Sequence, residues 1–139
     1  RFSFTLYKFL AAPAGEYILK SKQGADGFEC DLRLTKDGIA VLWHDADLKR
    51  RANNAAVVHE STYAQLAAIY PQIVTLDQFI DFGITEKKSL LLETKHPVPS
   101  RTEIENHVVQ KLHKEAKRIE KAGIDITVMS FSWFAVERV

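Results

Sequence analysis

Short apolar runs alternate with amphipathic segments along this chain. Apolar runs bounded by turn residues predict strands, and apolar residues recurring every three or four positions predict helices. The predicted strands are 27–33, 39–43, 89–95 and 127–132. The predicted helices are 14–23, 61–69, 75–82, 102–121 and one beginning at Trp133, whereas 1–12 and 45–60 are predicted loops. Strands alternating with helices favour a parallel sheet with crossover helices.

Capping residues set the predicted helix boundaries. Ser61 and Thr75 are expected N-caps, because their hydroxyl oxygens can accept hydrogen bonds from unpaired N–H groups of the first turn. Gly24, Gly83 and Gly123 are expected to end the helices that precede them.

The first two predicted strands are joined by the short turn Thr35-Lys36-Asp37-Gly38. A turn of this length normally joins antiparallel neighbours, since a parallel crossover needs a dozen or more residues. The connection within segment 27–45 therefore does not fit an otherwise parallel sheet.

Composition narrows the class of protein. The chain has 139 residues, is 46% hydrophobic and 27% charged, and carries a net charge of +1. This balance gives no electrostatic argument for binding nucleic acid, and the apolar runs are too short for stable membrane insertion. The single cysteine, Cys30, excludes an intramolecular disulfide and is expected to be a buried, inert thiol. The oligomeric state and the compartment stay open, with a cytoplasmic location favoured.

Ionisable residues stand at the ends of three predicted strands. Glu29 and Asp31 are two apart, as are Glu93 and Lys95, so each pair shares one face of its strand. Three converging acids need a cation to offset their charge, and a hard divalent ion, Ca²⁺ or Mg²⁺, prefers oxygen ligands. His44 can act as a general acid or base near neutral pH, and Lys95 could hold an anionic oxygen. Together they suit metal-assisted attack on a phosphate ester.

Structural explanations of the same residues stay open at this point. An E-x-D pair is commonly solvated or salt-bridged, Glu93 and Lys95 could pair with each other, and His44 could be a hydrogen-bonded structural histidine. Several other polar residues are assigned to the solvated surface, to loops or to the long helix: Asp47, Lys49, Arg50, Arg51, His59, His96, His107 and His113. The basic residues of the 47–51 loop could also attract a phosphate, and His96 is near the site although a loop position is expected for it.

Three stretches, "QGADGFECDLRLTKDGIAVLWHD", "LLLETKHP" and "TVMSFS", resemble the glycerophosphodiester phosphodiesterase family, and the resemblance covers roughly residues 14–139. It implies a TIM (β/α)8 barrel of the phospholipase C-like phosphodiesterase type, with its site at the C-terminal ends of the strands. It would also explain the short turn at 35–38, as a short loop between the second and third barrel strands.

The resemblance also implies roles for individual residues. Glu29, Asp31 and Glu93 match the metal-binding acids, Lys95 matches a substrate-contacting lysine, and His44 matches one of two histidines that act as acid and base. The implied reaction is metal-dependent hydrolysis of a small-molecule glycerophosphodiester, such as glycerophosphocholine, to glycerol 3-phosphate and an alcohol.

The chain departs from the family pattern in three places. It begins Arg1-Phe2-Ser3 without the family's His-Arg-Gly, it lacks an insertion after about residue 69, and it has too few strands for an eight-stranded barrel. Residues 1–139 are therefore expected to form a single, partial TIM-barrel domain. Two alternatives remain: a catalytically impaired relative that binds a phosphodiester or a partner without turnover, and an unrelated α/β domain in which these residues form structural ion pairs.

Overall fold

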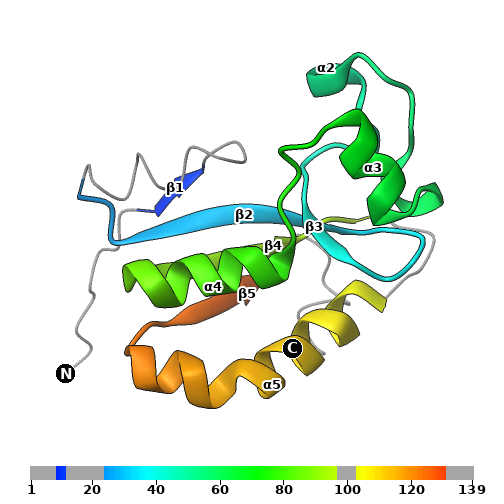
Figure 1. The fold of residues 1–139 in the computed structure, drawn as a ribbon. Helices are drawn as coiled ribbons and strands as arrows, with labels where there is room; N and C mark the ends of the chain where they lie inside the picture. Colours follow the sequence, from blue (N-terminus) through cyan, green and yellow to red (C-terminus); the bar gives the residue numbers. More distant parts are fainter. Residues whose placement is uncertain (1–8, 12–23, 97–102, 131–139) are drawn as a thin grey trace.

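The structure, a computed structural model, describes residues 9–11, 24–96 and 103–130 (Figure 1). Its strands are β1 (Phe9–Ala11), β2 (Gly27–Leu34), β3 (Ala40–Leu42), β4 (Ser89–Thr94) and β5 (Ile126–Met129). Its helices are α2 (Lys49–Ala52), the 3-10 helix η1 (Val58–Glu60), α3 (Tyr63–Ile69), α4 (Leu76–Glu86) and α5 (Glu103–Ala122). The predicted helices at 14–23 and from Trp133 lie outside the described residues.

Four strands form a parallel sheet in the order β1-β2-β4-β5. Helices α4 and α5 are the crossovers that lead into β4 and β5, and both cover the same face of the sheet (Figure 1). The core between them is built from alternate strand residues, which are Phe28, Cys30, Leu32, Leu90 and Leu92, packed against apolar residues of both helices. The intervening strand residues, Glu29, Asp31 and Glu93 among them, therefore project from the opposite face.

Strand β3 does not belong to this parallel path. It runs antiparallel to the end of β2, with Leu32 opposite Leu42 and Leu34 opposite Ala40. The expectation that the 35–38 turn joins two consecutive barrel strands is therefore wrong. The turn is too short for a parallel crossover, so the chain folds back on β2, and β4 takes the parallel position beside β2.

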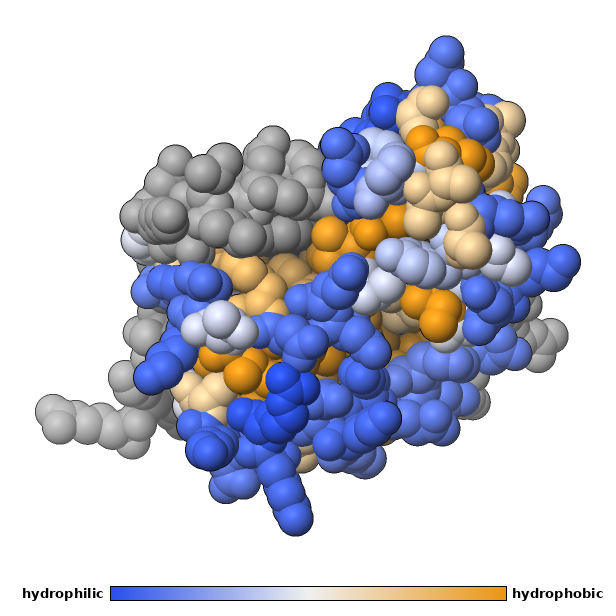
Figure 2. Space-filling model, viewed as in Figure 1, coloured by the Kyte–Doolittle hydropathy of each residue, from blue (hydrophilic) through white to orange (hydrophobic). Residues whose placement is uncertain are grey.

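A second apolar cluster packs β3 against the segments that follow it and fixes their loops. Val41, Trp43, Leu48, Val58 and Leu66 are buried there, together with Ile73. The predicted loop 45–60 accordingly contains two short helices, α2 and η1, because buried Leu48 and Val58 anchor it. On the face shown in Figure 2, hydrophilic residues dominate the outer surface and hydrophobic residues are visible mainly between them.

Several predicted boundaries need correction. Residues 9–11 form a strand within a predicted loop, because they pair with residues 27–29 of β2. Thr62, not Ser61, is the N-cap of α3, where it forms a capping box with Gln65.

The predicted N-cap of α4 and the predicted end of α5 agree with the structure. Thr75 caps α4 as predicted, again in a capping box. Gly123, at φ +66°, follows the last residue of α5 as expected. Among the described residues, none of the helices combines the length and the hydropathy of a membrane-spanning segment.

Gly83 does not end α4, which continues to Glu86. The glycine is required for packing: a Cβ built on Gly83 would lie 2.9 Å from Cδ1 and 3.0 Å from Cγ of Leu90 in β4. The absence of a side chain at Gly83 thus lets α4 approach the strand that carries Glu93.

We expect Gly83→Ala to destabilise the protein by about 1 kcal/mol, because the cost of overpacking against Leu90 exceeds the gain in helix propensity. Leu90→Ala should cost about 2–5 kcal/mol by itself. Since Leu90→Ala removes the clashing atoms, the double variant should lose the whole overpacking cost and keep the propensity gain, so it should cost less than the sum of the two single variants by about 2 kcal/mol. Denaturant unfolding of the three variants measures this coupling, and strict additivity would contradict the packing role of Gly83.

Candidate active site

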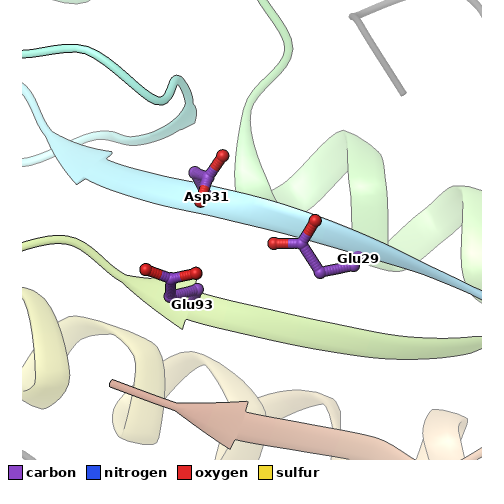
Figure 3. Close-up of side chains that lie close together, drawn as sticks. All are labelled: Glu29, Asp31 and Glu93. Atoms are coloured by element: carbon purple, nitrogen blue, oxygen red, sulfur yellow. The ribbon is translucent and has the colours of Figure 1, made fainter. Parts of the chain in front are cut away.

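Three carboxylates gather on the face of the sheet that α4 and α5 leave uncovered. Glu29 and Asp31 extend from β2, and Glu93 extends from β4 (Figure 3). Asp31 lies directly opposite Glu93 in the parallel register, and Glu29 lies opposite Leu91. One oxygen of each carboxylate lies within 4.8 Å of the others. The sequence prediction that these three acids converge is confirmed.

Crowding of like charges at the edge of the core affects the protonation of this cluster. Glu93 is only 6% exposed, and Glu29 and Asp31 are half-buried. Burial, followed by the charges of Asp31 and Glu93, raises the pKa of Glu29 above its ordinary value, against smaller opposing effects of Lys95 and His44. The ionised form of Glu29 is therefore less favourable here than in water, because burial and the neighbouring carboxylates both oppose its charge.

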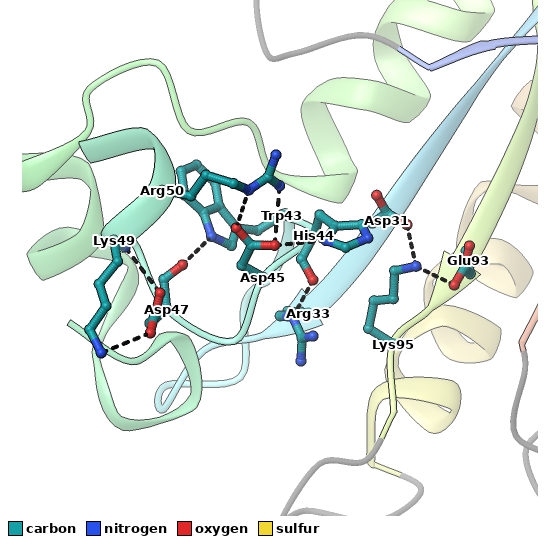
Figure 4. Close-up of polar contacts among 10 residues, drawn as sticks. All are labelled: Asp31, Arg33, Trp43, His44, Asp45, Asp47, Lys49, Arg50, Glu93 and Lys95. Carbon is teal, nitrogen blue, oxygen red and sulfur yellow. Dashed lines mark hydrogen bonds and ion pairs between the residues drawn. The ribbon is translucent and has the colours of Figure 1, made fainter. Parts of the chain in front are cut away.

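Lys95 supplies part of the compensating charge. Its Nζ lies 2.8 Å from Oδ1 of Asp31 and also contacts Oε1 of Glu93 (Figure 4). Burial lowers the pKa of Lys95, but its hydrogen bonds with Asp31 and Glu93 outweigh burial and raise it overall. Three ionised carboxylates and one ammonium leave two net negative charges, which is the charge that a divalent cation would neutralise. The oxygen-only donor set is also the one that Ca²⁺ and Mg²⁺ prefer.

His44 stands beside this cluster at the end of the hairpin. The Trp43 N–H donates to the Asp31 carbonyl oxygen (2.9 Å), and Arg33 Nε donates to the His44 carbonyl oxygen (2.9 Å). These two bonds tie the main chain at His44 to β2. The imidazole itself is 58% exposed and close enough for its charge to lower the pKa of Glu29. In Figure 4 the ring extends from Asp45 toward the strand that carries Asp31.

Asp45 fixes which nitrogen of His44 carries the proton. Its Oδ1 lies 2.7 Å from His44 Nδ1, and Arg50 contacts both of its oxygens. Hydrogen bonds from Arg50 and His44 lower the pKa of Asp45 to about 2, so its carboxylate is ionised and can only accept. Nδ1 must therefore donate, and the neutral ring keeps its lone pair on Nε2.

Asp45 and Arg50 are not among the site residues predicted from the sequence. Arg50 is predicted from the sequence to be a solvated loop residue. Its side chain is exposed, but it lies in α2 and its guanidinium is hydrogen-bonded to Asp45. The signal that could have found the pair is the acid next to His44 followed five residues later by an arginine.

None of the other described histidines belongs to the cluster of three acids. His107 and His113 are exposed on α5, and His59 lies in η1 beside Glu60. His96 does more than fill a loop: its Nε2 is 2.6 Å from Oε1 of the fully buried Glu105 of α5. Cys30 is buried as predicted, and burial raises its thiol pKa.

Glu29→Gln should stabilise the metal-free protein at pH 7. Because folding raises the pKa of Glu29 above its ordinary value of 4.5, the folded state binds more protons than the unfolded state just above that pH. As pH rises above 4.5, the free energy of unfolding of the wild type therefore falls, whereas that of Glu29→Gln, which has no ionisable group at this position, does not fall for this reason. The advantage of Glu29→Gln should vanish as pH falls below 4.5.

Melting temperatures at pH 7 and pH 4 in metal-stripped buffer measure this effect. Glu120→Gln makes the same chemical change at an exposed position of α5 and should alter neither value. A lower melting temperature for Glu29→Gln than for wild type at pH 7 would show that the ionised Glu29 carboxylate does not destabilise the folded protein.

Comparison with known proteins agrees with this arrangement. Residues 17–139 match the glycerophosphoryl diester phosphodiesterase family. A probable glycerophosphodiester phosphodiesterase of Mycobacterium tuberculosis is 34% identical over 143 residues, covering 88% of this chain and 52% of that protein. The chain spans about half the length of the curated relatives that match it over most of its length.

Solved structures show the same fold. The crystal structure of a Thermotoga maritima glycerophosphodiester phosphodiesterase superposes with a TM-score of 0.72 at 23% identity, covering 98% of this chain and 59% of that one. An Oleispira antarctica phosphodiesterase, in complex with the product sn-glycerol-3-phosphate, gives a TM-score of 0.68 at 20% identity, covering 94% and 59%. The α/β sheet described here is thus part of a TIM barrel, and the chain belongs to the glycerophosphoryl diester phosphodiesterase family.

Proposed function

We propose that the protein hydrolyses glycerophosphodiesters to glycerol 3-phosphate and an alcohol, with Ca²⁺ or Mg²⁺ held by Glu29, Asp31 and Glu93. The observation that carries this proposal is the cluster of three acids with oxygens within 4.8 Å of one another, in a chain of this family. Glu93 is the last residue but one of β4, with Asp31 opposite it in β2, and TIM-barrel enzymes hold their active sites at the C-terminal ends of the strands.

The donor set fits a divalent cation by chemistry and by charge. Three carboxylates balanced by only one ammonium leave an excess of negative charge that makes a cation favourable. A cation bound there would supply positive charge to stabilise the charge that develops on the phosphate oxygens. The half-exposed Glu29 and Asp31 leave the cluster accessible from solvent.

Lys95 and His44 supply the remaining chemistry of the proposal. Lys95, whose ammonium bonds to Asp31 and Glu93, orients both acids and places a positive charge where a phosphodiester anion would bind. His44, with its proton held on Nδ1, presents the basic Nε2 for proton transfer to or from the reacting oxygens. Its exposure leaves that nitrogen accessible to a small-molecule substrate.

The product complex of the Oleispira antarctica phosphodiesterase supports the substrate class, since that relative of like fold holds sn-glycerol-3-phosphate. The name of the Mycobacterium tuberculosis relative supports the same reaction. We further propose that residues 1–139 form one partial barrel domain, since the described strands β1, β2, β4 and β5 make one continuous parallel sheet.

Glu93→Gln should abolish metal-dependent turnover while the fold survives. The change is nearly isosteric but removes one of the three charges that favour the cation, so kcat/KM should fall by at least about a hundredfold. The assay follows glycerol 3-phosphate released from glycerophosphocholine in Mg²⁺ or Ca²⁺ by the protein expressed from its complete reading frame. Glu120→Gln on the exposed side of α5 is the matched control and should turn over at the wild-type rate.

Thermal unfolding separates the alternatives. A cation that binds only the folded state raises its stability, by about 2.7 kcal/mol at a concentration one hundred times Kd. Wild type should show this rise and Glu93→Gln should not. A rise without turnover would indicate a binding protein, and no rise with either cation would favour structural ion pairs and overturn the proposal.

A further inference from the structure

Arg50 is the outer member of a chain of contacts that ends at His44. Its Nε lies 2.6 Å from Oδ2 of Asp45, and its Nη2 lies 3.1 Å from Oδ1. The same Oδ1 lies 2.7 Å from His44 Nδ1. Figure 4 shows the three side chains in this order. Two parallel bonds from one guanidinium fix the plane of a carboxylate as well as its charge.

The backbone that carries Arg50 is itself anchored. Leu48, immediately before α2, is fully buried in the second apolar cluster, and its N–H donates to the Ala56 carbonyl oxygen (3.0 Å). The Trp43 indole donates to the Asp47 carbonyl oxygen at 2.8 Å. Asn53, at φ +49°, ends the helix. The short helix therefore presents Arg50 from a fixed position, although the side chain is 59% exposed.

His44 needs such support because packing does not hold its ring. The imidazole is 58% exposed, and among the described residues its only side-chain hydrogen bond is the one to Asp45. The main chain of His44 is fixed by Trp43 and Arg33, which leaves the ring orientation to Asp45. Asp45 is partly exposed as well, so a carboxylate without Arg50 would be free to rotate away from Nδ1.

We propose that Arg50 is a positioning residue, which acts through Asp45 to hold His44 in the tautomer and orientation that direct Nε2 toward the acidic cluster. This inference rests on the proposed function for its kinetic consequence, but the placement of the ring is a separate, measurable property. The alternative role for an exposed arginine is general attraction of an anionic substrate, which any nearby positive charge would share.

Arg51 offers a matched control for that alternative. It is the next residue on the same short helix and is exposed, and no hydrogen bond or ion pair joins it to another described side chain. Arg50→Gln and Arg51→Gln remove the same charge from almost the same place. Only Arg50→Gln removes the contacts to Asp45.

The test combines kinetics with nitrogen NMR of the histidine rings, in the protein expressed from its complete reading frame. Arg50→Gln should lower kcat for glycerophosphocholine by about tenfold, with KM within about twofold of wild type, as expected for loss of a supporting contact. The His44 ring signals should change from a single Nδ1-protonated tautomer to a mixture. Arg51→Gln should leave kcat, KM and the ring signals unchanged.

Two further variants sharpen the result. Arg50→Lys keeps the charge but not the two-pronged contact, so it should recover only part of the lost kcat. In Asp45→Asn protein, adding Arg50→Gln should cause no further loss, because Arg50 acts only through Asp45.

Three outcomes would overturn the proposal. They are an equal rise in KM for the Arg50 and Arg51 variants, full recovery by Arg50→Lys, and unchanged His44 ring signals in Arg50→Gln. If the wild type hydrolyses no glycerophosphodiester, the proposed function fails, and the ring signals of His44 still decide whether Arg50 positions it.

Discussion

The parallel pairing of β2 with β4 is the constraint on which the candidate site depends. The register sets Asp31 opposite Glu93, and the two-residue period of a strand adds Glu29 to the same face. A shift of one residue in either strand would turn its acids into the helix-covered core. The fully buried Phe28, Leu32, Leu90 and Leu92 resist such a shift, because each would then leave the core.

This arrangement gathers three carboxylates on a face of the sheet where their contact with water is limited. Glu93 is nearly buried, and burial together with its acidic neighbours disfavours ionisation of Glu29. Lys95 offsets part of the repulsion by bonding to Asp31 and Glu93. Repulsion among the three carboxylates favours the binding of a cation that would relieve it. Natural proteins commonly depart from the most stable arrangement at functional sites.

The convergence of the three acids could be predicted from the sequence better than the surroundings of the cluster. The two-residue spacings of Glu29 with Asp31 and of Glu93 with Lys95 predict shared faces, because side-chain alternation is a local property of a strand. The neighbour of β2 is not local: β4 lies beside it because the 35–38 turn folds β3 back antiparallel. Gly83 was likewise mistaken for a helix end, since the side chain that it accommodates, Leu90, comes from the next strand.

The contact of Arg50 with Asp45 escaped prediction for a related reason. A run of charged residues after His44 is typical of a solvated loop, but the burial of Leu48 and the backbone hydrogen bonds around it hold this run as a short helix. The anchoring partners of Leu48, such as Val58 and Leu66, lie ten or more residues away, so the local pattern contains no sign of them. Polar contacts that depend on such distant packing are the part of a site that a single sequence does not reveal.

Our proposal requires that Glu29, Asp31 and Glu93 together bind a divalent cation. A crystal of the protein grown with Mn²⁺, which accepts the same oxygen ligands as Mg²⁺ and scatters anomalously, tests it most directly. We expect an anomalous peak bounded by the three carboxylates. A map without a peak there, with the Lys95 ammonium still lying between Asp31 and Glu93, would contradict it.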